Sequence, residues 1–298
     1  MGLIYCKAGA EATFGTVAGT FTPIHVTDVT VKDDRGVIYD EITDQYLPQV
    51  AIGGGVKVDT TIEAAWRPEM FAPLLAALWG TSASPYTLGY PTPVSLQIGE
   101  KIGTVTRARN ILGNGVTSAT FTFAAKEFVK VSFDLIGQQG LDVTYDGSVT
   151  YTTENPLVFW GCTLVLGVTP VVAKEATLKI DRSLDAEQFV LGSFLRYRLA
   201  QTAVTDISGT ITLTEVDIAD VQQAQYGAAA ATQIPTATNA LGNGNLVFTC
   251  LKTDGSAGSV ITIPVVYESF DFKGSKVSEI GKTINWHAVG GAPSMVVS

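Results

Sequence analysis

Histidines, cysteines and clustered carboxylates are the residues of this 298-residue chain that could carry out chemistry. His25 and His287 are its two histidines, and each lies beside residues with a strand pattern, which favours a structural role. The three cysteines, Cys6, Cys162 and Cys250, are odd in number and far apart, which favours buried, reduced thiols in a protein made and kept in the cytoplasm. The sequence contains no Cys-x-x-Cys, no His-x-x-x-His and no Asp-rich calcium loop, so zinc and EF-hand sites lack a ligand set.

Two further motifs could bind ions or phosphates, and both have simpler interpretations. The carboxylates are densest in one cluster, which consists of Asp33, Asp34, Asp40, Glu41 and Asp44. A solvated acidic loop is the favoured interpretation of this cluster, and a metal site is the alternative. Gly-Asn-Gly occurs at 113–115 and at 242–244, but neither copy lies between a clear strand and a helix with a following lysine, so both are predicted turns. We therefore expect no catalytic residue, no metal, no cofactor and no enzymatic activity.

Composition and charge exclude several classes of function. The formal net charge is −9, which argues against binding nucleic acid or membrane through phosphate neutralisation. No apolar run approaches the ~20 residues that a membrane-spanning helix needs, and the first residues lack the pattern of a signal peptide. Only 16% of residues are charged, which is low for a globular protein, so much of the surface is neutral. Such a surface is often covered by neighbouring copies of the same chain.

The stretch Gly55–Gly80 is the element around which the chain is organised. Val56, Val58, Thr60 and Ile62 alternate as in a strand, and a helix with one apolar stripe follows and ends at Gly80. The helix residues expected to pack on the sheet are Phe71, Leu74, Leu75 and Leu78. Residues 209–227 repeat this unit, and the packing residues of their predicted helix are Ile218 and Val221.

Further repeats indicate a tandem duplication. Residues 28–35 match residues 175–182 at the separation of 147 that also relates Gly80 to Gly227, and residues 116–140 match 267–291 at a separation of 151. We predict a mainly β fold of two tandem β-sandwich domains, each with one short flanking helix. The expected organisation is an N-terminal arm at 1–25, a first domain at 26–140, a connector at 141–157 and a second domain at 158–298.

Each predicted domain contains a long excursion from its sheet, at Asp33–Gly54 and Arg182–Asp206. The excursions are too apolar for solvated loops, so we expect them to contact another subunit; folding down over their own domain is the alternative. The residues expected at this contact are Tyr39, Ile42, Tyr46, Leu47, Phe189, Leu191 and Phe194.

Taken in order, these stretches resemble the phage tail tube proteins (major tail proteins) of long-tailed viruses. The similarity extends over nearly the whole chain, although residues 141–156 and 228–245 depart from the pattern. It depends on the strand and helix that end in ALWG at 77–80, the hairpin that ends in VSFDLIG at 131–137, and the segments ATLKIDRSLDAEQFVLGS, ISGTITLTEVD and ITIPVVYESFDF of the second half.

The resemblance implies a β-sandwich flanked by a helix, with six such domains closed into a ring and the rings stacked into a hollow tube. With two domains per chain, three chains would form one pseudo-hexameric ring. The implied partners are further copies of this chain, a tape-measure protein, tail-end proteins and double-stranded DNA that passes without tight binding. The expected location is the virion tail, assembled in the host cytoplasm, with no membrane contact.

Two other functions stay open at this point. The inner tube of a contractile secretion or injection system is the closest alternative, and a β-sandwich surface adhesin would require the missing secretion signal. A lectin or carbohydrate-active enzyme is disfavoured because the four tryptophans are dispersed rather than clustered with paired carboxylates. The acidic balance of the chain further predicts a neutral or negative lumen; the alternative is that the excess acid only keeps the outside soluble.

Overall fold

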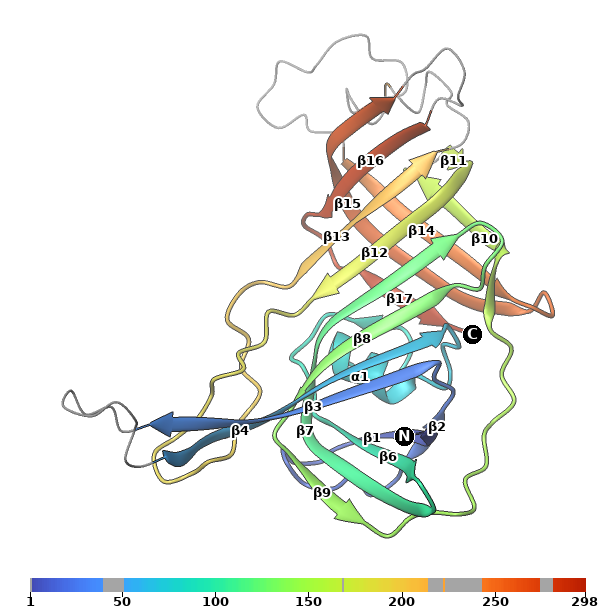
Figure 1. Cartoon of the computed structure of the whole chain (residues 1–298). Helices are drawn as coiled ribbons and strands as arrows, with labels where there is room; N and C mark the ends of the chain where they lie inside the picture. Colours follow the sequence, from blue (N-terminus) through green and yellow to red (C-terminus); the bar gives the residue numbers. More distant parts are fainter. Residues whose placement is uncertain (1, 40–50, 168, 214–221, 223–242, 274–280) are drawn as a thin grey trace.

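The computed structural model describes residues 2–39, 51–167, 169–213, 222, 243–273 and 281–298. Over these ranges the chain is mainly β, as the sequence predicts, with seventeen antiparallel strands joined into one sheet and one short helix. The sheet folds over on itself around an apolar core (Figure 1). In the part of the chain that the structure describes, no helix is long and apolar enough to cross a membrane.

The first half of the chain forms two layers that share the long strand β7. One layer contains β1 (Gly2–Ala10), β2 (Thr22–Ile24), β6 (Val94–Ile102), the first part of β7 (Val105–Ala124) and β9 (Gln139–Val143). The other contains β3 (Asp28–Tyr39), β4 (Ala51–Ala65), β8 (Lys130–Gly137) and the second part of β7. Because β7 belongs to both layers, it holds the two together.

Helix α1 (Ala72–Trp79) follows β4 and packs on this core. Pro73 lies in its first turn, where a missing N–H removes no helical hydrogen bond. Gly80 ends the helix in the left-handed conformation, with φ of 89°, and its N–H donates to the carbonyl of Ala76. The four residues predicted to face the sheet, Phe71, Leu74, Leu75 and Leu78, are fully buried.

The second half repeats the two-layer arrangement. Its strands are β10 (Leu157–Leu166), β11 (Thr169–Val171), β12 (Ala173–Asp181), β13 (Asp206–Leu213), β14 (Asn243–Lys252), β15 (Ala257–Lys273), β16 (Gly281–Ala288) and β17 (Ser294–Val297). The short strand β5 (Tyr86–Thr87) from the first half pairs with β17. Like β7, β15 is long and takes part in both layers.

Both halves pair their strands in the same order. Neighbours run β2-β1-β6-β7-β8-β4-β3 in the first half and β11-β10-β14-β15-β16-β13-β12 in the second. The irregularities also recur, since the β-bulge between Val116 and Ser118 has a counterpart between Tyr267 and Ser269. Each residue of the first bulge lies 151 positions before its counterpart in the second, which is the separation found in the sequence.

A strand pair joins the two halves edge to edge. The second part of β7 pairs with β12 over seven residue pairs, from Glu175 opposite Ala124 to Asp181 opposite Ser118. The sheet is therefore continuous from β3 through β4, β8, β7, β12, β13 and β16 to β15. Sequence periodicity did not predict this junction.

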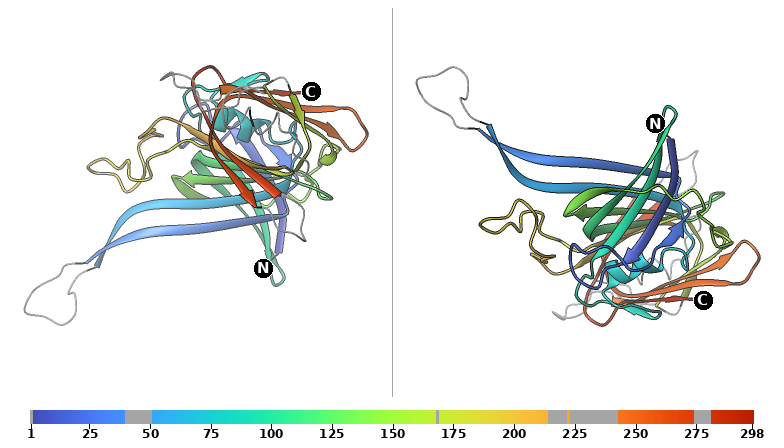
Figure 2. Two further views of the ribbon diagram at one scale, coloured as in Figure 1. Left: turned by 90° about the horizontal axis from the view of Figure 1, so that it is seen from above. Right: turned by 90° about the horizontal axis from the view of Figure 1, so that it is seen from below.

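The N-terminal residues and the first excursion differ from what the sequence predicts. Residues 1–25 were expected to lie outside the core, but β1 and β2 are part of it: Cys6, Ala8 and Ile24 are fully buried, because the small residues of β1 pack closely between β2 and β6. The excursion after Lys32 is not an irregular loop at its base, since β3 and β4 continue as a paired hairpin that projects from the body (Figure 2). The predicted helix with Ile218 and Val221 lies outside the described residues.

Candidate functional site

The outward face of the continuous sheet is a polar surface that the strand pattern creates. Along β4, β8, β12 and β13, buried apolar residues alternate with polar ones, because successive side chains of a strand point to opposite faces. In β8, for example, Val131, Phe133 and Leu135 are buried, whereas Lys130 and Asp134 are exposed. The polar residues therefore gather on the side away from the core.

Hydrogen bonds between strands tie this polar face together. Asp134 accepts hydrogen bonds from the hydroxyls of Thr61 and Ser118, at 2.9 and 2.8 Å, and so connects β4, β8 and β7. In the second half the hydroxyls of Thr177 and Thr210 lie 2.9 Å apart. Such side-chain pairs between strands stabilise a sheet by roughly 0.2–1 kcal/mol each, and they hold the face in one arrangement.

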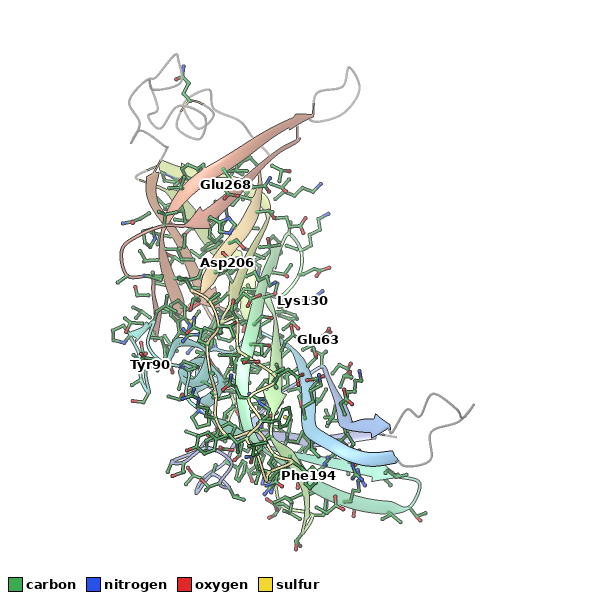
Figure 3. The ribbon with its side chains drawn as sticks, turned by 90° about the vertical axis from the view of Figure 1, so that its left-hand side faces the viewer. Glu63, Tyr90, Lys130, Phe194, Asp206 and Glu268 are labelled. Atoms are coloured by element: carbon green, nitrogen blue, oxygen red, sulfur yellow. The ribbon has the colours of Figure 1, made fainter. Side chains whose placement is uncertain are left out.

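Acidic residues outnumber basic ones on this polar face. Strand register places nine carboxylates with described side chains on it: Asp28, Asp34, Asp59, Glu63, Asp134, Glu175, Asp181, Asp206 and Glu268. The lysines are Lys32, Lys57, Lys130 and Lys179. Glu63, Lys130, Asp206 and Glu268 follow one another along the length of the molecule (Figure 3). The face is therefore hydrophilic and net negative.

A histidine lies between two of these carboxylates. The Nε2 atom of His287 is 2.7 Å from Asp206, and its Nδ1 atom is 3.1 Å from Glu268. The group is open to solvent, and its members are two carboxylates and one imidazole. Across the residues that the structure describes, no set of three or more His, Cys, Asp or Glu side chains is arranged to hold a metal ion.

The segment 182–205, which links β12 to β13, lies against the first half of its own chain. The N–H of Val56 donates to the carbonyl of Phe194 at 2.8 Å, and the side chain of Gln138 donates to the carbonyl of Arg196 at 2.6 Å. Arg196 is fully buried and donates to the carbonyl of Ile136 at 3.0 Å. The base of the segment is thus fixed to β4 and β8.

Apolar side chains in the same segment are nevertheless exposed. Leu191 is fully exposed, and Phe194 and Tyr197 are about two-thirds exposed, at 65% and 66%. Phe189 is half-buried against Gly55, where any side chain would collide with its ring. Exposed apolar residues grouped on one segment are typical of a surface that another protein covers.

Of the other predicted contact residues, the structure describes only the backbone position of Tyr39, in the projecting hairpin. Tyr39 is the last residue of β3 and pairs with Ala51. Ile42, Tyr46 and Leu47 lie outside the described residues. The structure therefore places the described part of the first excursion and the segment 182–205 on the same side of the molecule (Figure 2).

Sequence reasoning missed a set of buried ionisable groups that fix loops to the core. Glu154, in the connector, accepts hydrogen bonds from the backbone N–H groups of Glu69 and Met70, before α1. Burial raises the pKa of its carboxyl, and these hydrogen bonds partly offset the rise. Glu11 is held in a similar way by the N–H groups of Gly113 and Gly15. A single charged residue within a loop carries no sequence pattern that reveals such a role.

The chain was compared with models of protein families and with curated proteins. A family model described as phage tail tube protein matches residues 5–274, which is nearly the whole chain. No curated protein matches it significantly.

Proposed function

Because the chain belongs to the phage tail tube protein family, we propose that three copies close into a ring and that rings stack into the hollow tube of a virion tail. Family membership makes it a structural protein and not an enzyme. In the proposed tube, each half of the chain supplies one of six equivalent wall units. The polar face of the continuous sheet lines the channel.

The identical strand order of the two halves supports the view that each half is one tube domain. We propose that the first domain comprises residues 2–143 and the second residues 157–298, with 144–156 as the connector. This assignment moves β1 and β2 from the expected arm into the first domain, because they pair in the same way as β10 and β11 in the second.

The β7–β12 junction is the observation that carries the proposal. It shows how the edge of one half accepts the edge of the other, inside a single chain. Among the described strands, β3 pairs with β4 on one side and has no partner on the other. The last part of β15 likewise pairs with β16 on one side and has no partner on the other. An exposed edge tends to pair with another chain, and a closed ring leaves no edge free. We therefore propose that β15 of one chain pairs with β3 of the next.

The internal junction also predicts the register of this contact between chains. Residue 120 of β7 corresponds to 271 of β15 at the separation of 151, and residue 179 of β12 corresponds to 32 of β3 at the separation of 147. Because Thr120 lies opposite Lys179, Asp271 should lie opposite Lys32 of the neighbour. Opposite charges at one register position favour this pairing.

The acidic polar face suits a channel through which double-stranded DNA moves without binding. Each contact between a phosphate and a lysine or arginine releases counterions and favours binding, and a repeated contact would retain the DNA. A negative wall repels the duplex over a Debye length of about 8 Å at physiological salt. We propose that the same channel holds the tape-measure protein during assembly and that tail-end proteins close the tube.

Electron microscopy of the purified protein tests this function. Negative stain should show tubes, and a reconstruction should show three chains per ring with pseudo-sixfold symmetry. Six chains in each ring would mean that only one half of the chain forms the wall, and would overturn the three-chain ring. Protein that stays monomeric under all assembly conditions would count against the tube itself.

A further inference from the structure

Two of the three cysteines lie side by side. Cys162 in β10 and Cys250 in β14 occupy opposite positions in the strand register, and Cys162 donates a hydrogen bond to Cys250 with the sulfur atoms 2.8 Å apart. Both are free thiols. The sequence predicts buried, reduced thiols: Cys6 and Cys250 are buried, Cys162 is only half-buried, and two cysteines that are far apart in the sequence meet in the fold.

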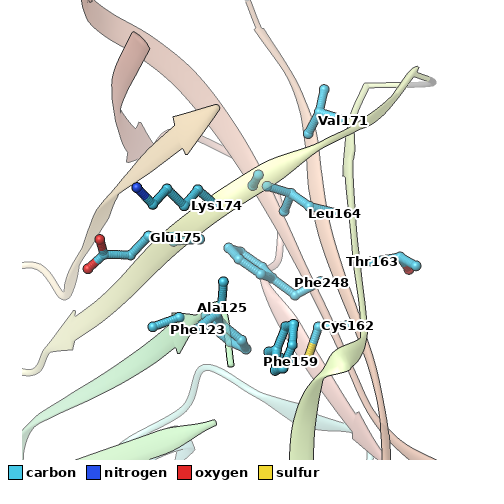
Figure 4. A pocket seen from close by; sticks show the side chains of 13 residues that line it. Phe123, Ala125, Phe159, Cys162, Thr163, Leu164, Val171, Lys174, Glu175 and Phe248 are labelled. Atoms are coloured by element: carbon cyan, nitrogen blue, oxygen red, sulfur yellow. The ribbon is translucent and has the colours of Figure 1, made fainter. Parts of the chain in front are cut away.

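The two thiols differ in access to solvent. Cys250 is buried, with 1% of its surface exposed, whereas Cys162 is half-buried. Cys162 also lines a small cavity of about 80 Å³, together with Phe123, Phe159 and Phe248. The view into this cavity shows Cys162 next to the ring of Phe159 (Figure 4). A water-sized reagent can therefore approach Cys162 before Cys250.

We propose that Cys162 and Cys250 are a peroxide-reactive pair that closes into a disulfide between β10 and β14. The Cys162 thiolate attacks one oxygen of hydrogen peroxide, the O–O bond breaks, and the departing hydroxide takes up a proton to leave as water. The product is a sulfenic acid at Cys162. The sulfur of Cys250 then attacks the Cys162 sulfur, the S–O bond breaks, and the thiol proton leaves with the hydroxyl group as a second water. Two thiols lose two electrons, and one peroxide is reduced to two waters.

The roles follow from the surroundings of each thiol. The hydrogen bond shared with Cys162, together with burial, raises the pKa of Cys250, which favours its neutral form until the neighbouring sulfur is activated. Cys6 serves as an internal reference, because it is fully buried and burial raises its pKa to about 12. The pair is a property of the folded chain and does not depend on ring formation. In a virion it would link the two strands covalently once the particle leaves the reducing host cytoplasm.

Peptide mapping after treatment with hydrogen peroxide tests the proposal. Purified protein is treated, the remaining thiols are alkylated, and the peptides are identified by mass spectrometry. Wild type should lose two thiols and yield one linked peptide pair that contains Cys162 and Cys250, with Cys6 still alkylated. The midpoint of thermal unfolding should rise by roughly 5 °C or more and return to its initial value after reduction.

Two serine variants separate the roles of the two thiols. In Cys250→Ser, dimedone should trap a sulfenic acid at Cys162, and in Cys162→Ser, Cys250 should resist oxidation as Cys6 does. Untreated variants are first compared with wild type by circular dichroism, and the wild-type peptide map decides alone where a variant does not fold. Treated wild type without the linked peptide, or Cys250 oxidised equally fast in both backgrounds, would falsify the proposal.

Discussion

Thr120 of β7 lies directly opposite Lys179 of β12, in the strand pair that joins the two halves of the chain. Their counterparts at the proposed contact between chains are Asp271 and Lys32. The internal pair is neutral against basic, and the outer pair is acidic against basic. If the outer contact copies the inner one, it carries an ion pair that the internal junction lacks.

The first prediction concerns this ion pair. Asp271→Lys should place like charges opposite each other at each contact between chains, so the protein concentration needed for tubes should rise several-fold, since each pair is worth up to about 1 kcal/mol. Lys32→Asp should have the same effect, and the combination should restore assembly. Sedimentation of tubes measures all three, with Lys130→Asp on the same face as the control. If the double variant does not assemble as well as wild type, the proposed register is wrong.

Ring stacking should depend on the exposed apolar residues of the segment 182–205. The double change Leu191→Ala and Phe194→Ala should leave rings folded but unstacked, because buried anchors at an interface contribute about 2 kcal/mol or more each. Phe189→Ala should in addition lower thermal stability, because Phe189 packs against Gly55 of its own chain. Microscopy and thermal unfolding distinguish the two effects. Normal tubes from the Leu191 and Phe194 variant would show that this segment does not mediate stacking.

Arg196 should hold the segment 182–205 against the sheet. Arg196→Ala removes hydrogen bonds to the carbonyls of Ile136 and Asp185, and leaving buried groups unpaired costs about 1–3 kcal/mol. Limited proteolysis should therefore cut this segment faster in the variant. Arg198→Ala is the matched control, since Arg198 is exposed. Equal cleavage rates in both variants would contradict the anchoring role.

Stability should depend on Asp146 only above acid pH. The pKa of Asp146 is lowered from 3.8 to about 2, mainly by a hydrogen bond from Lys7 and to a smaller extent by two hydrogen bonds from Ser148. A carboxyl with a lowered pKa in the folded state stabilises the fold above its unfolded pKa, and this contribution disappears as pH falls through the folded value. The stability difference between wild type and Asp146→Asn should thus be constant above about pH 5 and fall progressively as the pH drops from about 5 toward 1. Chemical unfolding from pH 7 to pH 2 measures it, and a difference as large at pH 2 as at pH 7 would contradict the assignment.

Intact tubes should not bind double-stranded DNA, even at low salt. Replacing Glu63 and Asp206 on the polar face by lysine should create binding that weakens steeply as salt rises, because each new phosphate contact releases counterions. Lysine in place of Glu127, which lies in the β7–β8 turn, provides a control outside the channel-facing set. Tight, salt-sensitive binding by wild-type tubes would instead show that the lumen is not repulsive.

The sequence alone identified most of the strands, helix α1 and the two separations, 147 and 151, that relate the halves. These features are local or repeated, and periodicity records them directly, since side chains alternate along a strand and recur every three to four residues along a helix. The bulges at Val116 and Tyr267 are also 151 positions apart, but only the structure revealed them.

Only the tertiary structure decided which strand edges meet. An alternating pattern indicates which face of a strand is buried, but it does not identify the neighbouring strand. Neither the β7–β12 junction nor the contact between Cys162 and Cys250 could therefore be derived from it. The core position of β1 was also invisible, because its Gly and Ala residues carry little apolar periodicity and are buried through close packing. The anchoring of Glu154 and Arg196 depends on backbone groups more than fifty positions away, and such contacts exist only once the chain has folded.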